Sequence, residues 1–293
     1  MFQIEPSKIH TKELHQYLLS IVGPRPIALA STIDLKRNNN LSPFSFFNIF
    51  SANPPIAIFS PARRVRNNTE KDTLKNIKQV KEVVINIVNY NLVEKASISS
   101  GEYEAEIDEF IKAGLTPIAS KKIKPFRVKE SPVQMECQVN QIIELGKNGG
   151  AGNLVICEII LIHIDENILN KDNQIDQNKI KLIGRMGGDW YSKGFDEALF
   201  EIQKPNKNCG IGLDQIPNKI KKNSIFNESD LCKLATVNKI PNKEEMELFK
   251  QNEWLKEVDS IKNRHERDKK IYLQAKKCLK NGNIEKAWKY LLY

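Results

Sequence analysis

The sequence predicts a mainly β fold, an antiparallel barrel with peripheral helices, followed by a helical C-terminal extension. Up to residue 200, short apolar and β-branched runs are separated by turns and short helical segments. A glycine-rich loop over 146–153 joins the two longest of these runs. After residue 241 the chain is strongly charged, with apolar residues at helical spacing. We therefore expect two parts, residues 1–200 and 201–293.

Hydrophobic periodicity gives the order of the elements in the first part. Strands are expected over 25–34, 55–61, 82–89, 135–146, 153–165 and 179–188. Helices are expected over 13–22, 71–80, 91–100 and 107–115. Asp72 or Thr73 can cap the second helix, and Gly114 can end the last. The strands do not alternate regularly with long helices, so a doubly wound parallel sheet is disfavoured.

The second part begins irregular and polar, with short apolar patches, and becomes helical after Pro241. We expect this extension either to pack on the barrel or to reach a partner.

Composition narrows the classes of function. The net charge of +9 comes from dispersed lysines without a long basic run, so a solvated surface is favoured over nucleic-acid binding. The longest apolar run, over 154–164, is interrupted by Glu158 and His163 and is too short to span a membrane. Five cysteines without a CxxC pair, and a start that lacks signal-peptide blocks, indicate a reducing, cytoplasmic location.

Several common catalytic patterns are missing from the sequence. The four histidines form neither HxxxH nor HExxH, and we expect His163 to be a packed strand residue rather than a chemical group. There is no GxSxG motif for a serine nucleophile. The glycine-rich loop lies between two strands and lacks the terminal lysine-serine or lysine-threonine pair of a P-loop, so it reads as a hairpin connection. Gly152 can in addition allow a ligand to approach closely.

The stretch "NLSPFSFFNIFSANPP" alternates phenylalanines with small hydrogen-bonding residues. Phe44, Phe46 and Phe47 can form the walls of an apolar slot, while Ser45 and Asn48 can supply polar groups along its edge. Taken alone, these phenylalanines could equally be core residues.

The segment "EKDT" lies where a helix is expected to begin. A helix start offers free amides to a phosphate, and Lys71 and the Thr73 hydroxyl would add to them. Arg63, Arg64 and Arg66 bring further positive charge, although such a loop could also be merely solvated.

The order of these segments resembles the flavin reductase-like family. The likeness runs through "GPRPIALAST", "NLSPFSFFNIFSANPP", "FSP", "KDTLKNI" and "VVINIV", and continues in "GNLVICEIILIHID" and "RMGGDWY". It covers roughly residues 10 to 200. The resemblance implies an FMN-binding split β-barrel that is typically a homodimer, with each flavin near the subunit interface. It does not explain the turn "RNNN" or the basic helical tail.

The resemblance also implies which residues surround the cofactor. The end of the first strand, at 31–32, would lie beside the flavin, and the 45–48 segment would line it. Ser60, Arg63 and the residues at 71–73 would lie towards the phosphate. Arg185 would reach the site from a later segment of the chain. The predicted cofactor-binding residues are Ser31, Thr32, Ser45, Phe46, Phe47, Asn48, Ser60, Arg63, Lys71, Asp72, Thr73 and Arg185.

Three functions remain open at this point. The first is an oxidoreductase in which NAD(P)H reduces bound FMN, which passes electrons to a small acceptor. The second is an FMN-binding electron carrier that a protein partner reduces, and the basic tail would then suit an acidic partner. The third is a barrel without flavin, kept as a scaffold. No catalytic acid-base residue is predicted, because a flavin carries its own reactive atoms.

Overall fold

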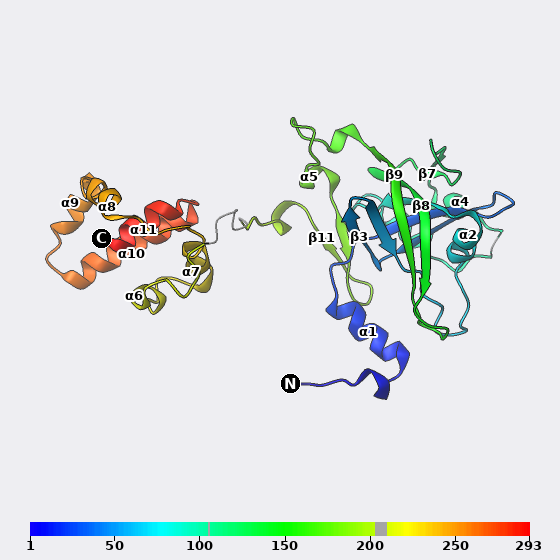
Figure 1. Ribbon diagram of the computed structural model, residues 1–293, viewed down its shortest axis with the longest axis horizontal. Coiled ribbons are helices and arrows are strands. Elements are labelled where there is room, and N and C mark those ends of the chain that lie inside the picture. Colours follow the sequence, from blue (N-terminus) through cyan, green and yellow to red (C-terminus); the bar gives the residue numbers. More distant parts are fainter. Residues whose placement is uncertain (105, 203–209) are drawn as a thin grey trace. The chain divides into compact units, whose positions relative to one another are not determined.

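The fold is described from a computed structural model, which describes residues 1–104, 106–202 and 210–293. The chain divides into two compact units, Met1–Phe200 and Glu201–Tyr293 (Figure 1). The two units have separate apolar cores, two in the first unit and one in the second.

The first unit is built on one antiparallel sheet whose described strands run in the order β2-β1-β5-β8-β9-β4-β3. The expected mainly antiparallel fold is thereby confirmed. The strands are β1 (Ala28–Ile33), β2 (Asn39–Phe44), β3 (Phe47–Ala52), β4 (Pro55–Phe59), β5 (Glu82–Ile87), β8 (Val133–Glu144) and β9 (Asn153–Ile164). The longest pair, β8 and β9, flanks the glycine-rich loop, as the hairpin prediction requires.

The two edges of this sheet are joined by a very short link. Strands β2 and β3 lie at opposite edges, yet only Ser45 and Phe46 separate them in the chain. A link of two residues spans only about 10 Å, so the sheet must curl until its edges nearly meet. Ser45 and Phe46 therefore mark the seam of a split barrel. The sequence did not predict strands here, because serines and asparagines interrupt the expected apolar pattern.

Helices cover both faces of the curled sheet. The first unit contains α1 (Thr11–Ile21), α2 (Asp72–Val80), α3 (Val93–Ile98), α4 (Glu109–Ala113) and α5 (Gln177–Ile180), with short 3₁₀ turns at Pro6–Lys8, Glu166–Ile168 and Asp196–Ala198. Gly114 ends α4 at φ 60°, as expected. The predicted capping of α2 by Asp72 or Thr73 is wrong: Lys71 holds the cap position, and no side chain caps the helix.

Alternation along β1 separates two apolar cores. Ala28 and Ala30 face the inner core, which α2 closes with Leu74 and Ile77. Leu29 faces an outer core shared with α3 and α4. Two further small sheets complete the unit: β6 (Pro117–Ile118) with β7 (Arg127–Val128), and β10 (Ile183–Arg185) with β11 (Tyr191–Lys193).

Glu136 of β8 is fully buried and anchors the segment before β7. It accepts hydrogen bonds from the amides of Lys121 at 2.8 Å and Lys122 at 2.6 Å. Its carboxylate also lies 2.7 Å from His163 Nε2, so His163 is engaged in packing, as the sequence suggested.

Replacing Glu136 with Gln is expected to remove part of the acid sensitivity of the fold. Burial alone would raise the pKa of Glu136, but its hydrogen bonds, with those from Lys121 and His163 prominent, lower it below its ordinary value. A carboxyl with a lowered folded-state pKa adds stability above its unfolded pKa, and this is lost as the pH falls through the folded pKa. In urea unfolding, the wild type should be the more stable at about pH 7, with the difference shrinking below about pH 4. A pH-independent difference would contradict this assignment.

The second unit is helical. Its described helices are α6 (Asn218–Lys221), α7 (Glu228–Leu234), α8 (Lys243–Phe249), α9 (Glu253–Asp259), α10 (Arg264–Lys280) and α11 (Ile284–Leu292). Asparagine side chains accept amide hydrogen bonds at the start of α7 to α11, which explains part of the high asparagine content. Helices α6 and α7 lie in the segment expected to be irregular, while the helical tail matches the prediction. The core centres on Trp288, whose Nε1 donates to the Leu234 carbonyl at 2.9 Å.

No helix of the described residues is long and apolar enough to cross a membrane.

Candidate functional site

The seam between the sheet edges brings several predicted residues to the surface. Phe46 is 39% exposed, and its ring lies 6.1 Å from the His15 ring in an edge-to-face arrangement. Asn48 is exposed, and its side chain accepts from the neighbouring amide of Ile49. Phe47 is half-buried against the inner core. Phe46 and Asn48 are therefore available to a ligand, whereas Phe47 is a wall residue.

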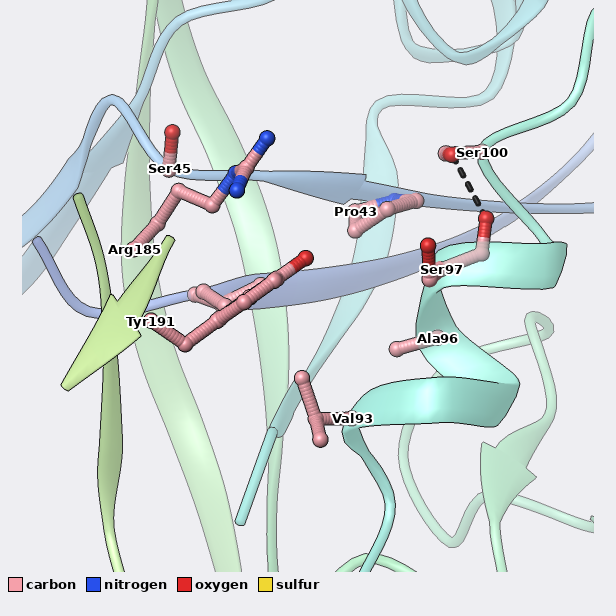
Figure 2. Close-up of a pocket in the computed structure, with 9 residues that line it drawn as sticks. Pro43, Ser45, Val93, Ala96, Ser97, Ser100, Arg185 and Tyr191 are labelled. Carbon is pink, nitrogen blue, oxygen red and sulfur yellow. Dashed lines mark hydrogen bonds between the residues drawn. The ribbon is translucent and has the colours of Figure 1, made fainter. Parts of the chain in front are cut away.

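A pocket of about 230 Å³ opens beside this seam (Figure 2). Figure 2 shows α3 on one side of it, and Tyr191 and Arg185 of the β10–β11 hairpin on the other. The guanidinium of Arg185 lies 4.6 Å from the centroid of the Tyr191 ring. The lining residues are Ile27, Pro43, Ser45, Val93, Ala96, Ser97, Ser100, Arg185 and Tyr191. This combination of apolar walls, hydroxyls and one cation suits a planar polar group.

Strand β2 is an edge of the sheet, and its residue Pro43 lines this pocket. The amide of Leu41 donates to the Glu109 carboxylate at 2.9 Å, so the N–H and C=O groups of Leu41 point away from β1. Along an antiparallel strand, every second residue directs its backbone groups to the same side, so the carbonyl of Pro43 also points away from β1. Proline has no amide hydrogen, so it is tolerated at this position. The Pro43 carbonyl therefore remains an acceptor at the open edge.

Arg64 and Lys71 lie at the start of α2, where Arg64 Nη1 donates at 3.0 Å to the carbonyl of Glu70, the residue before Lys71. Burial lowers the pKa of Lys71, and the neighbouring Arg64 guanidinium lowers it further. The Lys71 ammonium also lies 5.7 Å from the centroid of the Phe44 ring, which belongs to the inner core rather than to a ligand slot. The Nε atom of Arg64 is buried without a hydrogen bond among the described residues, although the Glu102 carboxylate lies 3.7 Å from it. An anion beside these two side chains would offset the repulsion between their charges.

The chain itself connects the surroundings of Arg64 to the pocket lining. Arg64 lies 3.7 Å from the Glu102 carboxylate, and Arg66 contacts the same group. Glu102 follows α3 by a few residues, and Ser100, just before it, lines the pocket. The segment from Ser100 to Glu102 therefore runs from the pocket lining to the carboxylate that contacts Arg64.

Thr73 and Thr32, predicted to contact the cofactor, have hydroxyls directed to Asn40 instead. Thr73 donates to Asn40 Oδ1 at 2.6 Å and Thr32 donates to it at 3.2 Å. The Asn40 amide in turn donates to Glu109 at 3.1 Å. These buried groups fix the start of α2 against β2, so they position the site. What α2 can still offer an anion is its first-turn amides, including those of Asp72 and Thr73.

Asn40 and Glu109 were missed by sequence reasoning. Glu109 is far from β2 in the chain, and its polar partners are visible only in the fold. Burial raises the pKa of Glu109, although the amide of Leu41 opposes this.

The other predicted residues have different surroundings. Ser60 accepts from the Asn153 amide at 3.1 Å, and a Cβ at Gly152 would lie 2.7 Å from its hydroxyl. That glycine therefore makes room for Ser60 and not, as expected, for a ligand. Arg63 pairs with Glu70 at 2.9 Å.

Asp72 and Ser31 complete the set. Asp72 pairs with Lys75 at 2.8 Å, on the surface of α2. Ser31 is buried, and its hydroxyl has no hydrogen-bond partner among the described residues. It neighbours Leu41 of the open edge strand in the β1–β2 register. The orphaned atoms of Ser31 and Arg64, together with the positive charges of Arg64 and Lys71, fit a phosphorylated planar cofactor.

Comparison with known proteins gives the family. The description "Flavin reductase like domain" matches residues 23–179. A protein of Aquifex aeolicus is 37% identical over 189 residues, which is 64% of this chain and 94% of that protein. The family match ends at residue 179, before the second unit.

Two solved structures are similar to about two thirds of the chain. Nitrilotriacetate monooxygenase component B from Bacillus cereus has a TM-score of 0.64 and 30% identity, covering 69% of this chain and 98% of its own. A Shewanella frigidimarina protein with a split barrel domain has a TM-score of 0.58 and 27% identity, covering 69% of this chain and all (100%) of its own. On its sequence and its curled antiparallel sheet, the chain belongs to the flavin reductase-like family and has a split-barrel fold.

Proposed function

We propose that the chain binds FMN and is an NAD(P)H-dependent oxidoreductase of flavin reductase type. The observation that carries this proposal is the placement of Arg64 and Lys71 at the start of α2, where Arg64 donates to the Glu70 carbonyl at 3.0 Å, together with a pocket that suits a planar group. The family membership supports the same cofactor class.

Each part of the site has a role under this proposal. Lys71, Arg64 and the first amides of α2 would hold the phosphate. Phe46 and Tyr191 would flank the ring, while Ser45 and the Pro43 carbonyl would meet its polar edge. When bound, the flavin supplies the redox chemistry, accepting a hydride and passing electrons on. Arg185 would contribute positive charge in the pocket, which stabilises negative charge near it.

The reductant and the acceptor are part of this proposal. No segment of the sequence reads as a dinucleotide-binding domain, so NAD(P)H would dock transiently on the exposed flavin face, and a small acceptor would follow it there. The cysteines that the structure describes, Cys137, Cys157, Cys232 and Cys278, are unpaired, which supports a cytoplasmic location.

A homodimer also belongs to the proposal. Strand β3 is a sheet edge that exposes Ile49 by 48% and Phe50 by 65%. Exposed apolar edge strands are templates for association, and pairing two copies would cover them beside the seam. Sedimentation equilibrium should give twice the 33.6 kDa chain mass, and a monomer at all concentrations would refute this part.

Anaerobic stopped-flow mixing of the FMN-loaded protein with NADH and with NADPH tests the activity. We expect at least one of them to bleach the flavin absorbance in seconds or faster. Dithionite provides the control that the bound flavin can be reduced. If dithionite bleaches it and neither nicotinamide does within minutes, the oxidoreductase proposal fails. The alternative would then be an electron carrier reduced by a protein partner, with the basic tail suited to an acidic one.

A further inference from the structure

The second unit contains a polar pocket that the flavin chemistry does not use. It has a volume of about 260 Å³ and lies where α10 meets the end of α9, α6 and the end of α11. The lining residues are Lys219, Asp259, Arg264, Arg267, Asp268, Ile271, Tyr272, Tyr290, Leu291 and Tyr293. The family match does not extend into this unit.

Positive charge prevails in this pocket. Lys219, Arg264 and Arg267 face two carboxylates. One of these, Asp259, already accepts a hydrogen bond from the Tyr293 hydroxyl. The uncommitted groups are thus mainly donors, which favours an anionic ligand over a cation.

Two buried polar atoms of the pocket residues have no partner among the described residues. Tyr272 is 6% exposed, and its hydroxyl makes no hydrogen bond. The Nε atom of Arg267, a donor that needs an acceptor, is likewise unsatisfied. Burying such groups without partners is costly. The Lys219 ammonium lies 5.6 Å from the centroid of the Tyr272 ring, so a cation lies over the face of the ring that carries this hydroxyl.

We propose that this pocket binds the phosphate group of a small phosphorylated molecule. A phosphate has enough acceptor oxygens to bond Arg267 and the Tyr272 hydroxyl together, with Lys219 and Arg264 balancing its charge. The pocket volume admits a phosphate and a small attached group, but not a polymer. The proposal does not depend on flavin binding by the first unit.

Isothermal titration calorimetry with inorganic phosphate tests the proposal, at constant ionic strength, on the full chain with one equivalent of FMN and no excess. The wild type should show saturable binding. Tyr272→Phe removes only the hydroxyl, and Arg267→Gln removes the guanidinium, so each should weaken binding by about tenfold or more. Lys277→Gln is the matched control, because Lys277 is exposed on α10 and does not line the pocket.

The variants also separate a ligand site from a purely structural one. Without phosphate, Tyr272→Phe should keep or raise the melting temperature, because it removes an unsatisfied hydroxyl. Binding that persists unchanged in Tyr272→Phe would overturn the proposal, as would an equal loss in Lys277→Gln or no saturable heat in the wild type. Any phosphate held by the first unit would persist in every variant, so this result is independent of the flavin proposal. A repeat with succinate shows whether a dicarboxylate can substitute; tighter binding of succinate than of phosphate would also overturn the assignment.

Discussion

Replacing Lys71 with Gln is expected to weaken FMN binding by about tenfold to a hundredfold, the range for a lost hydrogen bond to a charged group. Riboflavin, which lacks the phosphate, should bind the variant and the wild type equally. The reason is that Lys71 and Arg64 are placed to bind an anion, while the ring would bind in the pocket beside Ser45. Quenching of flavin fluorescence, titrated with each ligand, measures both affinities.

Lys75→Gln provides the matched control for this experiment. Lys75 lies on the same helix, is exposed, and pairs with Asp72 at 2.8 Å. The Lys75→Gln substitution removes the same charge at a position outside the proposed site, so FMN affinity should be nearly unchanged. If Lys71→Gln weakens FMN and riboflavin equally, Lys71 supports the fold and does not bind the phosphate.

Replacing Trp288 with Ala should destabilise the second unit by about 3–5 kcal/mol, the usual cost of emptying a large core site. Trp288 is fully buried, and its indole donates to Leu234 across the core. Since whole domains are stable by only about 5–15 kcal/mol, the helical unit should lose much of its stability. The core of the first unit shares no residues with this one, so FMN affinity should be retained.

Circular dichroism at 222 nm and flavin fluorescence, followed together during heating, measure this effect. The helical signal should melt at a lower temperature in Trp288→Ala, and flavin release should keep its wild-type midpoint. Trp288→Phe keeps most of the buried surface and should cost less. A wild-type melting curve for Trp288→Ala would contradict the assigned core.

The regular strands of the fold could be predicted from the sequence because their patterns are local. The β8–β9 pair has long apolar runs on either side of a glycine-rich loop, and that pattern leads directly to a hairpin. The stretch that forms β2 and β3 was harder. Its two strands lie at opposite edges of the sheet, which depends on how the whole sheet is arranged. Proline also normally argues against a strand, but Pro43 lies on an edge strand at a position where no amide hydrogen is needed.

The part of the candidate site at the start of α2 could be predicted from the sequence, because a positive charge there coincides with a predicted helix start. Lys71 is predicted at the start of α2 from the "EKDT" segment alone, and in the structure Arg64 donates to the carbonyl of Glu70, the residue before it. The direction of a hydroxyl cannot be predicted in this way. Thr32 and Thr73 point to Asn40 because a buried acceptor lies there, and that acceptor is held by the sequence-distant Glu109.

The most direct test is a crystal structure of the chain grown with excess FMN. It should show the phosphate within hydrogen-bonding distance of Lys71 and Arg64, with the ring in the pocket between α3 and Tyr191. An empty site there at saturating FMN, or a phosphate bound away from both cations, would contradict the account.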